Sequence, residues 1–327
     1  MKIAIMMMAT DFEPSTRNVK AFVDTVVSYY DENRDKFKNE YDFYIYSSSH
    51  YPFGIDDACG SIREKRPDPD KHPSLYELII NEHEDIYHTF EKTVYAFSYI
   101  HSYRNPYDLY VRVNISMFLN MDLLDAVADK LKPGCIYCNA INSYINASSK
   151  YVNDLYGRGD LLIFDHSVIK IFLEKADTYM YEDVKVKDRC GIDHVDDCML
   201  GLCFIDGVGK DYYKRIYMLN YNYIPEYNMD ENVERRINRW AIGSRVKTVP
   251  QEIGYSGYSW EDNEWRVKDA EKMRKLEEYY RKMNFDYNGV KFADVLVDKK
   301  NSRPTLFVQM GNVNVYDVFW KYLEQKR

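Results

Sequence analysis

The 327-residue sequence lacks several features that would assign it to large classes of proteins. It has no basic excess, because its formal net charge is −8, and this argues against a nucleic-acid backbone as the main partner. No internal repeat, low-complexity linker or membrane-spanning apolar stretch is present. The motifs of P-loop proteins, dinucleotide-binding folds and serine hydrolases are missing as well.

The cysteines and histidines show no metal-ligand spacing. Cys135 and Cys138 are two residues apart, but no second pair of Cys or His lies at a zinc-binding distance from them. Both lie in a strand-like segment, so we expect their thiols to pack in the core, and a reduced, intracellular location fits best. The apolar N-terminus is too short for a signal peptide or a membrane anchor, so we expect a soluble, cytoplasmic protein.

What is present is the composition of a globular protein that can bury a large core, with 46% hydrophobic and 29% charged residues. The chain has 32 tyrosines but 14 glycines. Tyrosine rings could stack on sugars or bases, although packing at the edge of the core is the commoner reason for them.

The N-terminal part alternates strands and helices. An apolar strand at Ile3–Ala9, a helix capped by Ser15 or Thr16, and a strand at Asp42–Ser47 are typical of a nucleotide-binding α/β domain. Further elements are expected as a loop at 52–72, a helix at 74–103, a strand at 109–113, a helix at 120–131, strands at 136–141 and 160–165, a helix at 167–176 capped by Asp165, and a helix from 196.

After residue 210 the pattern changes. Tyrosine-rich, strand-like segments run to about residue 227, and another strand is expected at 240–249. A long amphipathic helix is predicted at 264–283 and a final helix at 315–323. We therefore expect an α/β domain with a mixed sheet over residues 1–250, and a C-terminal elaboration over 251–327 that packs on the same domain.

The most informative stretch is a strand, a triplet and a helix. The strand at 109–113 runs into Asn114-Ile115-Ser116, and the helix opens at Asn120. This arrangement resembles the metal-binding loop of GT-A glycosyltransferases, which transfer a sugar from a nucleotide diphosphate. Their triplet is usually Asp-x-Asp or Asp-Asp-Asp. The resemblance implies a GT-A fold with a sugar-nucleotide site that has lost its metal-binding charges.

Three more segments resemble the β-1,3-galactosyltransferase and Fringe branch of these enzymes, in the right order. The segment 84–93 is similar to that branch's D-I…D-F…L-K-T motif, and 156–165 is similar to its G-x-G-Y-x-L-S motif, with Gly157 and Gly159 in place. The third, VDDCMLG at 195–201, is close to the Fringe form D-D-C-T-V-G.

The acid pair Asp196-Asp197 in the third segment has a chemical interpretation. Inverting sugar transfer needs a carboxylate that takes the proton of the acceptor hydroxyl, and one in the first turn of a helix is held by backbone N–H groups. The resemblance places this role on Asp197, with Asp196 in support; a simple helix cap is the alternative. His194 is a candidate for the acceptor pocket, with local capping as its alternative.

The metal that GT-A enzymes usually employ is not expected. Mn²⁺ or Mg²⁺ would normally neutralise the departing diphosphate, but Asn114 and Ser116 supply only neutral oxygens, suited to hydrogen bonds with a ribose or phosphate. The histidine that often precedes the family's basic strand is also missing from AIGSRVK at 241–247. We therefore expect no cofactor, with Mn²⁺ or Mg²⁺ disfavoured.

Fixed cations could replace the ion. Arg245 and Lys247 alternate along a strand and so share one face, where they could stabilise a diphosphate or simply meet solvent. Other candidate contacts of the nucleotide-sugar are Arg112, Arg158 and, after the first strand where GT-A enzymes bind the uracil and ribose, Thr10, Asp11 and Arg17.

The resemblance thus predicts a bacterial or virus-encoded hexosyltransferase-like enzyme of polysaccharide biosynthesis. It would move a sugar from a nucleotide-diphosphate donor, a UDP-sugar by preference, to a glycan or glycolipid hydroxyl, with inversion and without metal. An inactive relative that binds a glycan, a nucleotide sugar or a partner enzyme is the alternative, although the retained acid pair argues against it. A third reading shifts the metal motif to Asp108 or Asp122, neither of which has a carboxylate two residues away.

Overall fold

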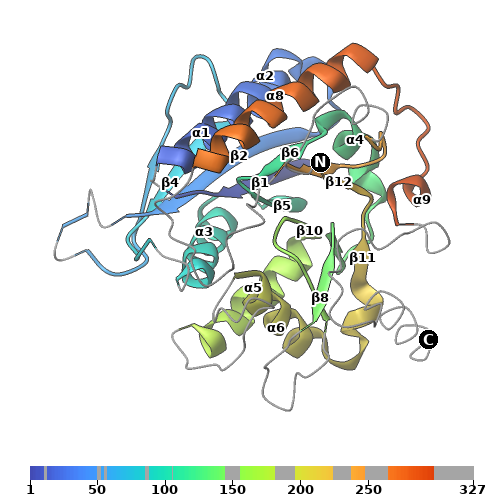
Figure 1. The fold of residues 1–327 in the computed structure, drawn as a ribbon. Helices are drawn as coiled ribbons and strands as arrows, with labels where there is room; N and C mark the ends of the chain where they lie inside the picture. The colour runs from blue at the N-terminus through green and yellow to red at the C-terminus, as the bar shows by residue number, and fades with distance from the viewer. Residues whose placement is uncertain are drawn as a thin grey trace.

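A computed structural model describes residues 1–10, 13–49, 53–54, 57–84, 88–104, 106–143, 155–180, 196–223, 237–246 and 264–297. They form an α/β fold in which helices cover both faces of a mixed sheet (Figure 1). The described strands of the eight-stranded main sheet are, in spatial order, β11 (Ile216–Met218), β7 (Ile136–Cys138), β10 (Leu161–Asp165), β5 (Leu109–Asn114), β1 (Lys2–Met8), β2 (Glu40–Ser48), β4 (Leu75–Ile80) and β3 (Ile62–Lys65).

The centre of the sheet is parallel. β1 pairs in parallel with β2 and β5, and β2 pairs in parallel with β4. These strands are covered on both faces, which explains their nearly continuous apolar sequences. Their carboxyl ends therefore share one edge of the sheet. β10 is antiparallel to β5, so β10 begins at that same edge.

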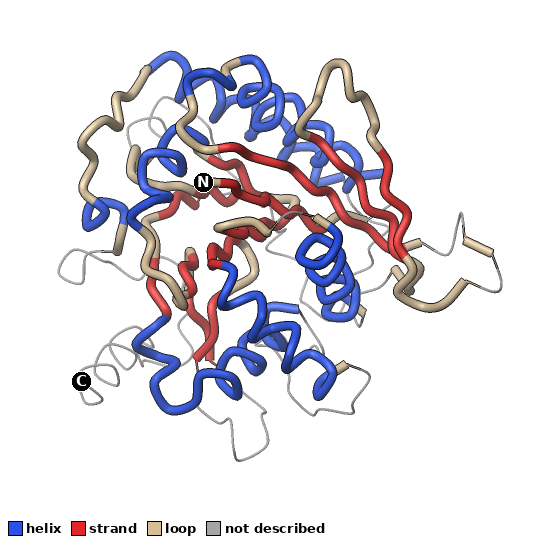
Figure 2. Tube along the Cα trace, turned by 180° about the vertical axis from the view of Figure 1, so that it is seen from behind, coloured by secondary structure: helices blue, strands red, loops and turns tan. Residues whose placement is uncertain are grey.

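Two helical layers enclose the sheet, as Figure 2 shows from behind. One layer contains α1 (Glu13–Phe22), the π-helical η1 (Val23–Val27), α2 (Ser28–Glu32), α4 (Met121–Val127) and α8 (Glu264–Met283); the other contains α3 (Thr89–Tyr103), α5 (His166–Tyr179) and α6 (Asp196–Val208). An apolar core lies on each face of the sheet, and successive side chains of β1 point into the two cores alternately, because side chains alternate along a strand. Ile3 and Ile5 belong to one core, and Ala4 and Met6 belong to the other.

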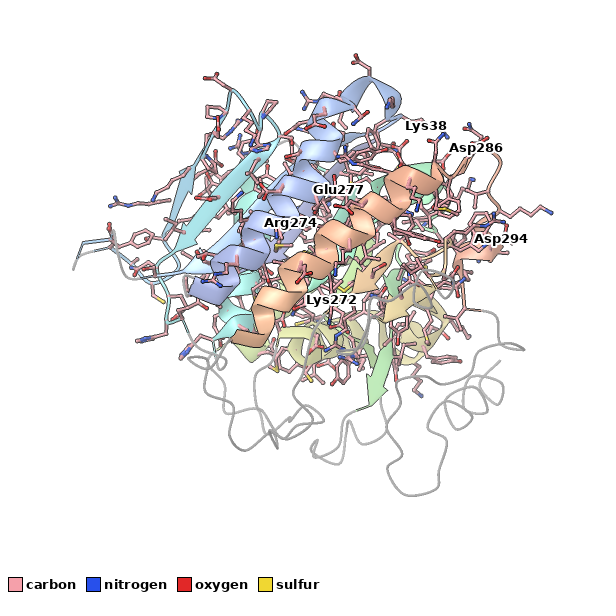
Figure 3. All side chains as sticks on the ribbon, turned by 45° about the horizontal axis from the view of Figure 1, so that its top comes forward. Lys38, Lys272, Arg274, Glu277, Asp286 and Asp294 are labelled. Carbon is pink, nitrogen blue, oxygen red and sulfur yellow. The ribbon has the colours of Figure 1, made fainter. Side chains whose placement is uncertain are left out.

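Helix α8 confirms the helix predicted at 264–283. It lies beside α1, and Figure 3 labels Lys272, Arg274 and Glu277 along it. Met273 and Leu276 are fully buried, while Arg274 pairs with Asp24 of η1 at 3.5 Å. The amphipathic pattern therefore marks the side of the helix that packs on the domain.

Two predicted helix starts are confirmed by their caps. Asp165 accepts hydrogen bonds from the N–H groups of Ser167 (3.1 Å) and Val168 (3.2 Å) at the start of α5. Asn120 accepts from the N–H of Leu123 at 3.2 Å at the start of α4. Both caps satisfy donors that have no partner inside the helix.

The prediction for residues 52–103 is wrong in two places. The expected loop contains β3, and the expected helix at 74–103 begins with β4, so that α3 starts only at Thr89. A short apolar run such as 75–80 is compatible with a strand or a helix. Here its pairing with β2 makes it a strand. β3 was not predicted because it is an edge strand with exposed Arg63 and Lys65, and such a charged pattern is common at sheet edges.

Smaller elements complete the described part. β6 (Met117–Leu119), which was not predicted, pairs antiparallel with β13 (Gly243–Arg245), and β13 pairs in parallel with β12 (Tyr221–Tyr223). The remaining elements are β8 (Ile141–Ser143), β9 (Leu155–Gly157), η2 (Arg34–Lys36), η3 (Ala128–Lys130), η4 (Gly209–Arg215) and α9 (Phe292–Val295). The helix expected at 315–323 lies outside the described residues.

Among the helices that the structure describes, none is both long and apolar enough to span a membrane.

Candidate functional site

Four chain segments meet where β5 ends. They are the triplet that follows β5, the turn at 158–160 before β10, the start of α6, and β13. Main-chain hydrogen bonds join them: the Asn114 N–H donates to the Asp160 carbonyl at 3.1 Å, and the Val246 N–H donates to the Ser116 carbonyl at 2.9 Å. The carboxyl edge of the sheet therefore gathers polar residues that are distant in the sequence.

Asp197 is held by the backbone at this edge. One of its carboxylate oxygens accepts the Gly159 N–H at 2.8 Å, and the other accepts the Cys198 N–H at 2.9 Å. The residue is partly exposed, unlike Asp196, which is 3% exposed. Burial, together with the neighbouring Asp196 carboxylate, raises the pKa of Asp197 to about 6. The site thus contains an oriented carboxylate that can accept a proton near neutral pH.

Asp196 points away from the surface and is paired with Arg112. The Arg112 guanidinium donates to Asp196 Oδ2 at 2.5 Å, and the side chains are 1% and 4% exposed. Thr93 Oγ1 donates to the same oxygen at 3.4 Å. The structure therefore places Arg112, a candidate contact of the nucleotide-sugar, inside the core, where it neutralises a buried carboxylate.

Gly159 permits the close approach of these groups. A Cβ atom at this position would lie 2.6 Å from Arg112 Nη1 and 3.0 Å from Asp197 Cβ. No side chain fits there unless one of the two neighbours moves. This explains physically why the turn, which the sequence marks only as a motif, has glycine next to the acid pair.

A second cluster, with Asp160 at its centre, lies beside the first. Asp160 Oδ2 is 3.2 Å from Arg158 Nη2 and 3.1 Å from Arg245 Nη1. The three side chains are 13%, 21% and 11% exposed, respectively. Asp160 was not among the predicted site residues, although its place directly after Arg158-Gly159 was a signal that could have indicated it.

The triplet does not fit a divalent cation. The Asn114 Oδ1 atom accepts the Ser116 N–H at 3.1 Å, so the amide closes a local turn. Ser116 is 2% exposed. Neither residue has a carboxylate, which is the ligand that Mn²⁺ and Mg²⁺ prefer. In the part of the chain that the structure describes, no three His, Cys, Asp or Glu side chains gather as a metal site.

The two alternative metal ligands lie elsewhere. Asp108 precedes β5, at the opposite end of that strand from the triplet, and accepts the Lys2 N–H at 2.7 Å. Asp122 of α4 accepts the hydroxyl of Tyr29, a residue of α2, with both oxygens, at 3.0 and 2.8 Å, within one of the helical layers. Neither arrangement forms a metal site beside Asp197.

The other predicted site residues are placed as follows. Thr10 follows β1 and is partly exposed, and Arg17 is exposed on α1. Outside the described residues lie Asp11, His194 and Lys247. The structure brings together, around the end of β5, Arg112, Asn114, Ser116, Arg158, Asp196, Asp197 and Arg245.

An ion pair that the sequence did not assign to the site lies at the same edge of the sheet. Lys92 is 1% exposed, and its ammonium donates to Glu84 at 2.5 Å and to the Ala9 carbonyl at 3.2 Å. Glu84 also accepts the Ser48 N–H at 2.7 Å. The pair thus ties α3 to the carboxyl ends of β1 and β2.

Comparisons with known proteins find similarity only in structure: no family model and no curated protein sequence matches the chain. The galactosyltransferase LgtC, in complex with donor and acceptor sugar analogues, aligns over 84% of this chain and 95% of its own at 12% identity, with a TM-score of 0.41. The glycosyltransferase GlyE of Streptococcus pneumoniae TIGR4 aligns over 86% and 63% at 9% identity (TM-score 0.38). The bifunctional glycosyltransferase WbbM aligns over 86% and 51% at 10% identity (TM-score 0.39). Likenesses this distant do not assign an activity.

Proposed function

We propose that the protein is a glycosyltransferase that moves a sugar from a nucleotide-diphosphate donor, preferably a UDP-sugar, to a glycan or glycolipid hydroxyl. The reaction inverts the anomeric carbon and uses no metal. The observation that carries the proposal is Asp197, a partly exposed carboxylate fixed by two main-chain N–H groups at the edge where β5 ends. The ordered motifs at 84–93, 109–124, 156–165 and 195–201 support the same function.

Asp197 acts as the general base. As the acceptor hydroxyl attacks the anomeric carbon, its proton passes to the Asp197 carboxylate, and the bond from that carbon to the diphosphate breaks. A pKa of about 6 leaves the carboxylate ionised at neutral pH yet more basic than an ordinary aspartate. The buried Arg112–Asp196 pair keeps the first turn of α6 in place.

Cations stabilise the leaving group. Arg245 and Arg158 face the same carboxylate oxygen, so both guanidinium groups converge on one point of the site. A departing diphosphate that gains negative charge is stabilised by such fixed donors without a metal. Lys247, two residues further along the strand, adds a third positive charge in this proposal, and the partly exposed Asn114 lines the nucleotide, whereas Ser116 is buried.

Calorimetric titration tests the proposal. The purified chain is titrated with UDP and a panel of nucleotide sugars, each in EDTA and again with Mn²⁺. We expect binding that EDTA does not change and that the Arg245→Ala/Lys247→Ala double variant loses. Binding that requires Mn²⁺ would contradict metal independence, and failure of every nucleotide to bind would contradict the donor class.

An inactive protein that binds a nucleotide sugar or a glycan is the second candidate, because the triplet offers a metal no carboxylate. The variant Asp197→Asn separates the two functions. In an enzyme it lowers turnover of the donor identified by calorimetry by about 10²- to 10⁴-fold and leaves donor binding intact. In a binding protein the wild-type chain already shows no transfer to any acceptor, and the variant changes nothing.

A further inference from the structure

We infer that Asp160 is an internal counter-ion that competes with the donor's diphosphate for Arg158 and Arg245 and thereby speeds release of the nucleoside-diphosphate product. The inference rests on the proposed function, because it concerns the regulation of the same site. It assigns a role to a residue that neither the motifs nor the acid pair explain.

The geometry is that of an occupied anion site. A single oxygen, Asp160 Oδ2, lies within 3.2 Å of both guanidinium groups. Carboxylate and phosphate oxygens accept from the same N–H groups of arginine with similar geometry, so one can replace the other. Arg245 Nε is buried and has no hydrogen-bond partner among the described residues, so a further donor becomes available to an anionic oxygen when the guanidinium turns from Asp160 to the ligand.

The cluster is exposed enough to exchange partners. All three side chains keep part of their surface exposed, so solvent or a ligand can reach the cluster, unlike the Arg112–Asp196 pair. A diphosphate carries more charge than one carboxylate and can displace it. Asp160 stays attached to the chain beside the arginines, however, and its high local concentration favours its return when the product begins to leave. If product release limits turnover, this competition raises the rate of the cycle.

The side chain of Asp160 can be changed without removing its main-chain hydrogen bond to Asn114. The Asn114 N–H bonds to the main-chain carbonyl of Asp160, not to its carboxylate. The variant Asp160→Asn therefore keeps that hydrogen bond and the size of the side chain, and removes the negative charge. Asp24→Asn is the matched control, because Asp24 also pairs with two cations, Lys20 at 2.8 Å and Arg274 at 3.5 Å, but in the helical layer.

The test is titration of the full chain and both variants with UDP and with inorganic pyrophosphate, in EDTA. Asp160→Asn is expected to bind both ligands about 3- to 30-fold more tightly, and Asp24→Asn within about twofold of wild type. With an acceptor present, the single-turnover rate stays unchanged in Asp160→Asn while kcat falls, because release slows. Adding Arg158→Ala to Asp160→Asn should abolish the gain in affinity.

The possible failures are distinguishable. Binding of UDP to wild type, but equal or weaker binding to Asp160→Asn at an unchanged melting temperature, overturns the counter-ion role and leaves the proposed function intact. Absence of binding of UDP and pyrophosphate to all the proteins overturns both. Mn²⁺-dependent binding that Asp160→Asn loses would instead make Asp160 a metal ligand, which also overturns the inference.

Discussion

Two arginine–carboxylate clusters lie side by side at the end of β5, and they differ in burial more than in chemistry. The Arg112–Asp196 pair is 1% and 4% exposed, whereas the side chains around Asp160 are 11–21% exposed. A buried pair cannot lose one partner without leaving an uncompensated charge, whereas a partly exposed pair can exchange its partner for a ligand or for water. Burial therefore distinguishes the Arg112–Asp196 pair, which holds the site together, from the cluster around Asp160, which is open to a ligand.

The largest expected effect comes from breaking the buried cluster. Arg112→Ala should lower the free energy of unfolding by about 3–5 kcal/mol, because it leaves the Asp196 carboxylate buried without its cation. Urea denaturation measures the change. Arg158→Ala is the matched variant in the partly exposed cluster and should cost less, because Asp160 keeps Arg245 as a second cation and keeps some contact with water. Equal losses of unfolding free energy in the two variants would contradict the view that burial distinguishes the two clusters.

The glycine between the clusters gives the next largest effect. In Gly159→Ala the new methyl group would lie 2.6 Å from Arg112 Nη1, so we expect a loss of about 1–3 kcal/mol and a marked fall in transfer. Gly54→Ala is the control, because a Cβ there meets no atom closer than 3.8 Å. A Gly159→Ala variant as stable and active as wild type would show that Arg112 and the turn are not in rigid contact.

Because the pKa of Asp197 is raised, we expect pH to have opposite effects on activity and on stability. The rate constant kcat/KM should rise about tenfold per pH unit below about 6 and level off above it, because the base must be ionised. Since the folded pKa exceeds the ordinary value of 3.8, the folded state binds the proton more tightly, and stability falls as the pH rises from about 4 to about 6. Asp197→Asn should remove this slope, because the amide does not titrate. A pH profile that is flat between 5 and 7 would remove Asp197 from the mechanism.

A carboxylate with neutral partners should give the smallest effect. Asp165 caps α5 through two backbone N–H groups, so Asp165→Ala is expected to cost about 1 kcal/mol. Thermal unfolding measures this cost, and Asp165→Asn, which keeps the acceptor oxygen, should recover most of it. A loss as large as that of Arg112→Ala would mean that cation pairing is not what distinguishes Asp196.

Local signals explain which elements could be predicted. The caps at Asn120 and Asp165 and the apolar period of α8 lie within a few residues of the features they specify, and the structure confirms them. β3 and β4 were missed because pairing between segments, and not local pattern, decides their state. The gathering of Asn114, Arg158 and Arg245 beside Asp197 followed from family motifs and could not be obtained from spacing alone.

The sequence by itself determined the α/β class, the apolar strands β1, β2, β5 and β10, the amphipathic helix at 264–283 and the residues available for chemistry, because hydrophobic period and capping act over short distances. Only the tertiary structure decided what each charged residue does. It buried Arg112 against Asp196, turned the Asn114 amide back onto its own turn, and placed Asp160 between two arginines. The physical reason is that burial and pairing, which set the strength of a charge and the pKa of an acid, arise only when distant segments pack together.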